Sequence, residues 1–113
     1  MPGLYIGSTA GYSGKNTITV GLGLGFQQAG LKVGYMKPVG AMPLETDAGL
    51  GDEDALFVRD ALGLEADPAH TPPAMTPVVV THDFKVDAFE GRLPGVADGG
   101  LVRNIASAYK GLE

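Results

Sequence analysis

The sequence contains no cysteine, which excludes disulfide scaffolds, thiolate zinc sites and cysteine nucleophiles. It also lacks any run of about 18 apolar residues, so no segment of it is expected to span a bilayer. The first residues, Met1, Pro2 and Gly3, do not have the basic region that opens a signal peptide. We therefore expect a cytoplasmic protein that has no membrane partner.

Basic residues are scarce, because 8 Lys and Arg stand against 13 Asp and Glu and the net charge is −5. A nucleic-acid-binding surface needs a basic stripe, and none is visible, so we expect no nucleic-acid partner. An anionic small molecule would need a focused local site, because the overall field repels it. The 113 residues are 44% apolar and 19% charged, which favours one small globular domain over a disordered chain.

Strand and helix patterns alternate over the first part of the chain. The apolar residues 4–8 predict a short buried strand. Residues 15–29 predict a helix whose apolar stripe packs on a sheet, and Gly30 is a natural helix stop. Residues 31–36, which precede Pro38, predict a second strand. This order predicts a βαβ unit with parallel strands and a right-handed crossover.

The rest of the chain predicts two further helices and one short strand. Residues 40–51 lack a clear pattern and are expected to form a loop. A helix is expected over residues 52–62, because three acids at its start suit the positive end of the helix dipole and Gly63 closes it. The remaining expectations are an irregular segment at 66–77, a strand at 77–81, a helical turn at 86–90 and a helix at 101–112.

The segment between the first strand and the first helix has the spacing of a phosphate-binding loop, G-x-x-x-x-G-K-[ST]. Successive backbone N–H groups in such a loop bind an anion, and the dipole of the following helix adds to the attraction. Gly11 and Gly14 permit the required backbone angles, and Lys15 supplies a positive charge that reaches β- and γ-phosphates. The candidate phosphate-binding residues are Thr9, Gly11, Tyr12, Ser13, Gly14, Lys15, Asn16 and Thr17.

Two positions depart from this motif. Thr9 stands in place of the first glycine, and Asn16 stands in place of the hydroxyl that normally binds magnesium. The amide oxygen of Asn16 is a weaker ligand for a metal. Thr17 comes one position late and is expected to point elsewhere. The alternative interpretation is a glycine-rich turn with an exposed lysine.

Two further residues are candidates for the same site. Lys37 follows the second predicted strand at its carboxyl end, where α/β folds bind ligands. Asp54 lies at the start of the acidic helix, where capping and dipole compensation are the alternative to metal binding. His70 and His82 lack the spacing of metal ligands, and we expect both on the surface.

Beyond these motifs, much of the chain resembles the dethiobiotin synthetase-like P-loop family. This group includes dethiobiotin synthetase, the cobyrinic acid a,c-diamide synthases and the N-terminal domain of some phosphotransacetylases. The likeness is strongest up to Gly40 and extends through the second helix. The segments that carry it are Leu4–Thr9, Gly14–Lys15, Gly21–Leu24, Gly30–Gly40 and Asp52–Arg59.

The resemblance implies a P-loop NTPase-like three-layer α/β/α fold with a small parallel sheet, which binds ATP with Mg²⁺. It implies that Lys15 and Lys37 act in phosphoryl transfer and that Asp54 holds the metal. Asn16, which departs from the family at the hydroxyl position, is the second candidate metal ligand. Domains of the family are about twice this length, and the chain ends at Glu113, before their later strands. The sheet is therefore expected to be incomplete, with edges that a second copy or a partner chain covers.

These features give three hypotheses for function. The first is the N-terminal part of an ATP-dependent enzyme that activates a carboxylate, as dethiobiotin synthetase and cobyrinic acid a,c-diamide synthase do. The second is a non-catalytic, nucleotide-sensing regulatory module that resembles the N-terminal domain of phosphotransacetylase. The third is a structural interaction domain whose loop binds nothing. In the first two, the partner is a nucleotide or another small molecule that contains phosphate.

Overall fold

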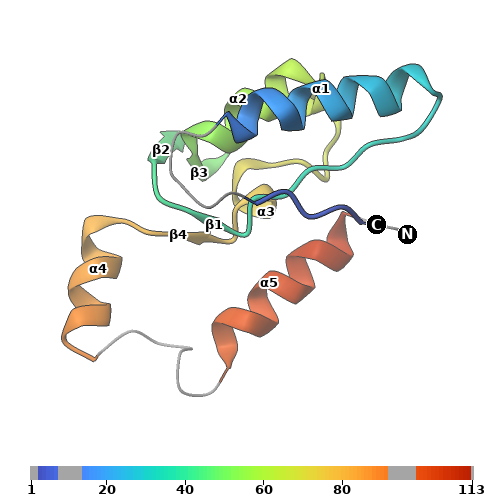
Figure 1. Ribbon diagram of the computed structural model, residues 1–113. Coiled ribbons are helices and arrows are strands. Elements are labelled where there is room, and N and C mark those ends of the chain that lie inside the picture. Colours follow the sequence, from blue (N-terminus) through green and yellow to red (C-terminus); the bar gives the residue numbers. More distant parts are fainter. Residues whose placement is uncertain (1–2, 8–13, 92–98, 113) are drawn as a thin grey trace.

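The computed structural model (Figure 1) combines helices and short strands in a mixed α/β chain, and it describes residues 3–7, 14–91 and 99–112. The helices are α1 (Lys15–Gln28), α2 (Glu53–Ala61), α3 (Pro72–Met75), α4 (His82–Phe89) and α5 (Gly100–Gly111), with a 3₁₀ turn η1 (Leu64–Ala66). The strands are β1 (Val39–Gly40), β2 (Pro43–Thr46), β3 (Gly49–Asp52) and β4 (Val78–Val79).

The three long helices form where the periodicity predicts them. α1, α2 and α5 begin and end within two residues of their expected bounds. Asp52 caps α2 through a hydrogen bond from the Ala55 N–H, and acidic residues occupy its first turn, as the helix dipole favours. Gly30 and Gly63, with φ of 85° and 70°, lie in the left-handed region that glycine tolerates best at the end of a helix.

The described part of the chain has two small two-stranded sheets. β1 pairs in parallel with β4, with Val39 opposite Val78. β2 and β3 form an antiparallel hairpin with Pro43 opposite Asp52. In Figure 1, α1 and α2 lie above the β1–β4 pair, and α4 and α5 lie below it. The predicted α/β class is confirmed. The predicted small parallel sheet is confirmed only as the single β1–β4 pair.

The prediction of two strands in a βαβ unit is wrong. Residues 4–7 and 31–36 have no strand structure, and Ser8 lies outside the described residues. The backbone donors of Tyr35 and Lys37 have partners elsewhere in the chain. The Tyr35 N–H donates to the His70 imidazole at 3.0 Å, and the Lys37 N–H donates to the Met75 carbonyl at 2.9 Å. The segment therefore runs beside residues 70–75 without a regular ladder.

Residues 40–51, expected as a loop, instead contain most of the β2–β3 hairpin. A two-residue turn at Asp47 and Ala48 joins the strands. The Thr46 hydroxyl donates to the Gly49 carbonyl at 2.8 Å, and Gly49 has a φ of 122° that side-chain-bearing residues rarely adopt. Cross-strand pairing and this glycine, rather than any hydrophobic pattern, therefore form the hairpin.

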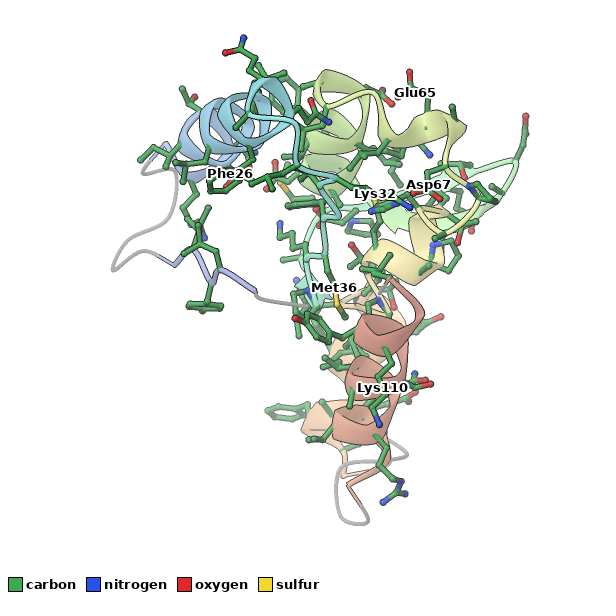
Figure 2. All side chains as sticks on the ribbon, turned by 90° about the vertical axis from the view of Figure 1, so that its right-hand side faces the viewer. Phe26, Lys32, Met36, Glu65, Asp67 and Lys110 are labelled. Atoms are coloured by element: carbon green, nitrogen blue, oxygen red, sulfur yellow. The ribbon has the colours of Figure 1, made fainter. Side chains whose placement is uncertain are left out.

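The core lies between α1, α2 and η1. Val58, Leu62 and Leu64 are buried, and Val20 and Tyr35 pack against them. α1 meets this core through Gly23 and its neighbours, and the apolar stripe that was expected to pack on a sheet stays exposed. That stripe includes Ile18 (56% exposed), Leu22 (39%) and Phe26 (39%); Figure 2 labels Phe26 on α1.

Candidate functional site

Lys37 is at the centre of a cluster of charged and polar side chains. Its ammonium donates to Asp52 Oδ1 at 3.1 Å and to Asp54 Oδ2 at 3.0 Å. The other oxygen of Asp54 accepts a hydrogen bond from Asn16 Nδ2 at 3.0 Å. Lys37, Asn16 and Asp54, which were predicted separately from the sequence, therefore come together. We call these three residues, together with Asp52, the Lys37 cluster.

Three elements position the cluster. Asn16 lies in the first turn of α1, near the end of the predicted phosphate-binding segment. Asp52 is the N-cap of α2, and Asp54 lies in its first turn. Lys37 comes from the segment before β1, where its backbone N–H is held by the Met75 carbonyl. Because α1 and α2 pack against each other, their N-terminal turns meet at Lys37.

The amino end of α1 has no side-chain cap. Gly14 occupies the N-cap with a φ of 83°, and no acidic residue lies in the first turn. Backbone N–H groups at such an end attract an anion. Lys15 and Thr17 are both exposed. The other candidate loop residues, Thr9, Gly11, Tyr12 and Ser13, lie outside the described residues.

Ion pairing shifts the pKa values of Lys37 and of Asp54. Burial alone would lower the pKa of Lys37, but the hydrogen bonds to Asp54 and Asp52 outweigh it and hold the pKa above its ordinary value. Burial would raise the pKa of Asp54, and the bonds from Lys37 and Asn16, with the charge of Lys15, hold it below its ordinary value. Both groups are therefore charged near neutral pH.

Tyr35 borders the same cluster. Burial, followed by the negative charges of Asp52 and Asp54, raises the pKa of its hydroxyl to about 12. The hydroxyl therefore stays protonated near neutral pH. Tyr35 was not predicted as part of a site, and only its place two residues before Lys37 could have suggested it.

Sequence reasoning missed Asp52 as a member of this site. Asp52 was expected only as an acid at the start of a helix, yet its side chain is fully buried and bonded to Lys37. The one sequence signal for a close approach is Gly40, since a Cβ there would lie 2.6 Å from Asp52 Oδ2. A glycine just after the Lys-Pro-Val stretch thus leaves room for the Asp52 carboxylate.

His70 is a second residue that the sequence placed wrongly. It was expected on the surface, yet it is only 3% exposed, and its Nε2 accepts the Tyr35 N–H at 3.0 Å. Its Nδ1 lies 3.2 Å from an Asp67 oxygen. The Ala69 N–H, followed by His70 and Lys32, holds the pKa of Asp67 below its ordinary value, and Figure 2 labels Lys32 and Asp67 near each other. His70 is therefore a structural residue, whereas His82 is exposed, as predicted.

Only part of a magnesium site is visible in the cluster. Magnesium in nucleotide sites keeps several waters and takes one or two carboxylates plus phosphate oxygens. Asp54, with 33% of its side chain exposed, and the amide oxygen of Asn16 fit this sparse requirement. Across residues 3–7, 14–91 and 99–112, no three His, Cys, Asp or Glu side chains gather to hold a metal by themselves.

No family model matches this sequence, and no solved structure gives a significant match. We therefore infer the chemistry of the site from its own residues. Among the helices that the structure describes, none has the length and hydropathy needed to cross a membrane.

Proposed function

We propose that this chain binds the phosphate groups of ATP, together with Mg²⁺, at the amino end of α1. The observation that carries the proposal is the convergence of Lys37, Asn16 and Asp54 beside a helix end that follows a P-loop-like sequence. Cationic side chains, an uncapped helix terminus and a metal-binding carboxylate are the groups that phosphates need.

A broader proposal rests on the resemblance of the sequence to a known family. We propose a dethiobiotin synthetase-like P-loop domain, cytoplasmic, whose three-layer fold a second copy or a partner chain completes. In this function, ATP activates a carboxylate through a phosphoryl intermediate. Lys15 and Lys37 neutralise the phosphates, and Asp54 and Asn16 hold the metal ion. When bound, the ion offsets charge on the transferring phosphate.

One observation favours the alternative of a non-catalytic, nucleotide-sensing module. Asn16 gives its N–H to Asp54 at 3.0 Å, and Lys37 takes the other oxygen of the same carboxylate. Both Asp54 oxygens thus have partners within the protein, and the hydroxyl that usually binds magnesium is missing. A module of this kind would bind ATP or ADP without turning it over.

Calorimetric titration of the chain with ATP and ADP, with and without Mg²⁺, tests the proposal. Binding by the parent chain and at least about a tenfold weaker Kd for Lys15→Ala are expected, because a charge-assisted contact is lost. Lys85→Ala, which removes an exposed lysine on α4, is the matched control and should keep the parental Kd. No binding by the parent chain, or an unchanged Kd for Lys15→Ala, would overturn the proposal.

The same titration separates the two candidate functions when it is followed by a phosphate-release assay. The enzyme requires Mg²⁺-dependent release of phosphate in the presence of a carboxylate substrate. The sensing module requires binding with no release under any of these conditions.

A further inference from the structure

Asp52 receives three hydrogen bonds although solvent does not reach it. Its Oδ1 accepts from Lys37 Nζ and from the Ala55 N–H, each at 3.1 Å. Its Oδ2 accepts from the Met42 N–H at 3.1 Å, and the residue is 0% exposed. The side-chain amide of an asparagine at this position would point its own N–H group at one of these donors in either of its two orientations. Only a carboxylate therefore satisfies all three donors.

The surroundings of Asp52 fix it in place. The Met42 carbonyl accepts the Glu53 N–H at 2.9 Å, so Met42 is tied to the start of α2 through both of its backbone groups. A Cβ on Gly40 would lie 2.6 Å from Asp52 Oδ2, so the backbone passes directly over the carboxylate. These contacts leave Asp52 little freedom to turn away from Lys37.

Asp54 differs from Asp52 in burial and in the kind of donors it accepts. A third of its side chain is exposed, and its hydrogen bonds come from the side chains of Lys37 and Asn16 rather than from backbone groups. Side-chain donors at a partly exposed site are exchanged for solvent or ligand more readily than buried backbone donors. Asp52 is thus the more firmly held of the two carboxylates that contact Lys37.

We propose that Asp52 is a positioning residue that holds the Lys37 ammonium at the phosphate-binding end of α1, while Asp54 releases Lys37 when ligand binds. This inference rests on the proposed function. A lysine that is already fixed binds phosphate without the entropy cost of ordering a long side chain. Because Lys37 faces two carboxylates, release from Asp54 also frees its positive charge for an anion.

A pair of isosteric variants of the full chain, Asp52→Asn and Asp54→Asn, separates positioning from charge. Each removes one negative charge beside Lys37, so a pure charge effect would strengthen the binding of ATP in EDTA for both. Positioning predicts that Asp54→Asn binds ATP more tightly than the parent, whereas Asp52→Asn binds about tenfold more weakly. Changes of the same sign in both variants would overturn the inference.

A second measurement does not depend on nucleotide. An immobilised lysine has distinct NMR shifts for its two Hε protons, and free rotation averages them. The Lys37 Hε protons should be distinct in the parent and in Asp54→Asn, and averaged in Asp52→Asn. If Asp52→Asn melts without cooperativity, Asp52→Ser replaces it, since serine also caps helices and adds no amide donor.

These outcomes distinguish the two proposals. Absence of ATP binding by the parent would end the proposed function, while the Hε shifts would still decide the role of Asp52. Averaged Lys37 Hε protons in the parent, or distinct ones in either Asp52 variant, would overturn the positioning role. Loss of the distinct shifts in Asp54→Asn as well would show that Asp54 holds Lys37 equally.

Discussion

Asn16 is the residue at which this chain departs most clearly from the phosphate-loop motif. Its side chain donates to Asp54 at 3.0 Å, a contact that a threonine hydroxyl at the same position is too short to reproduce in full. An ammonium and an amide thus occupy the Asp54 carboxylate, where the motif would leave room for a metal ion.

We predict that Asn16→Thr increases the magnesium dependence of ATP binding, because it restores the hydroxyl that the motif turns toward the ion and frees one oxygen of Asp54. Calorimetric Kd values with Mg²⁺ and with EDTA measure the dependence. Asn16→Ala, which removes the amide without adding a hydroxyl, is the control. A response to chelator in Asn16→Thr equal to that of the parent would count against this role.

His70 has a structural role rather than a catalytic one. We predict that His70→Phe lowers the free energy of unfolding by about 1–3 kcal/mol, because it leaves the partly buried Tyr35 N–H without its partner. Urea denaturation followed by circular dichroism measures this. His82→Phe, at an exposed site, should change stability by less than about 0.5 kcal/mol. Equal effects of the two substitutions would show that the contact between Tyr35 and His70 contributes nothing.

At the scale of elements, sequence periodicity predicted helices well and strands poorly. α2 could be predicted because its acids, apolar face and closing glycine are local signals. The strand expected at 31–36 does not form, because the Tyr35 N–H bonds to His70 and the N–H of the next residue but one, Lys37, bonds to Met75, and no local pattern encodes such distant partners. The same holds for the site: the position of Lys37 after a predicted strand suggested a ligand site, but Gly40 signals only a close approach and does not identify Asp52 as the group that approaches.

Two glycines of α1 test how this helix packs. A Cβ on Gly23 would lie 2.7 Å from a Leu62 methyl carbon, whereas nothing lies within 4 Å of one on Gly21. We predict that Gly21→Ala raises the free energy of unfolding by about 0.5–1 kcal/mol through helix propensity. Gly23→Ala should lower it by about 1 kcal/mol, since Leu62 is buried and must shift. Chemical denaturation measures both, and equal gains would contradict the packing of α1 on α2.

At the scale of the whole molecule, the surface is larger than the mass suggests. The chain exposes 7411 Å², whereas a monomer of 11.6 kDa typically exposes about 5,800 Å². The apolar stripe of α1, which the sequence pattern assigned to a buried face, contributes to that surface. The pattern therefore predicted a packing surface that this single chain does not cover.

We predict that the chain associates, most simply as a two-fold homodimer. Light scattering at micromolar concentration should give a mass above 11.6 kDa. Ile18→Lys, which places a charge on the exposed stripe, should shift the mass toward the monomer, whereas Lys85→Glu on α4 should not. A sharply melting parent chain at the monomer mass would show that it closes its core alone.

The central claim is that phosphate binds where the start of α1 meets the Lys37 cluster. Amide NMR shifts of the full chain, followed as ATP and Mg²⁺ are added, locate the ligand directly. The largest shifts are expected at Gly14, Lys15, Asn16 and Lys37, with little change along α4 and α5. Shifts centred on α4 or α5, or none at millimolar ATP, would contradict the claim.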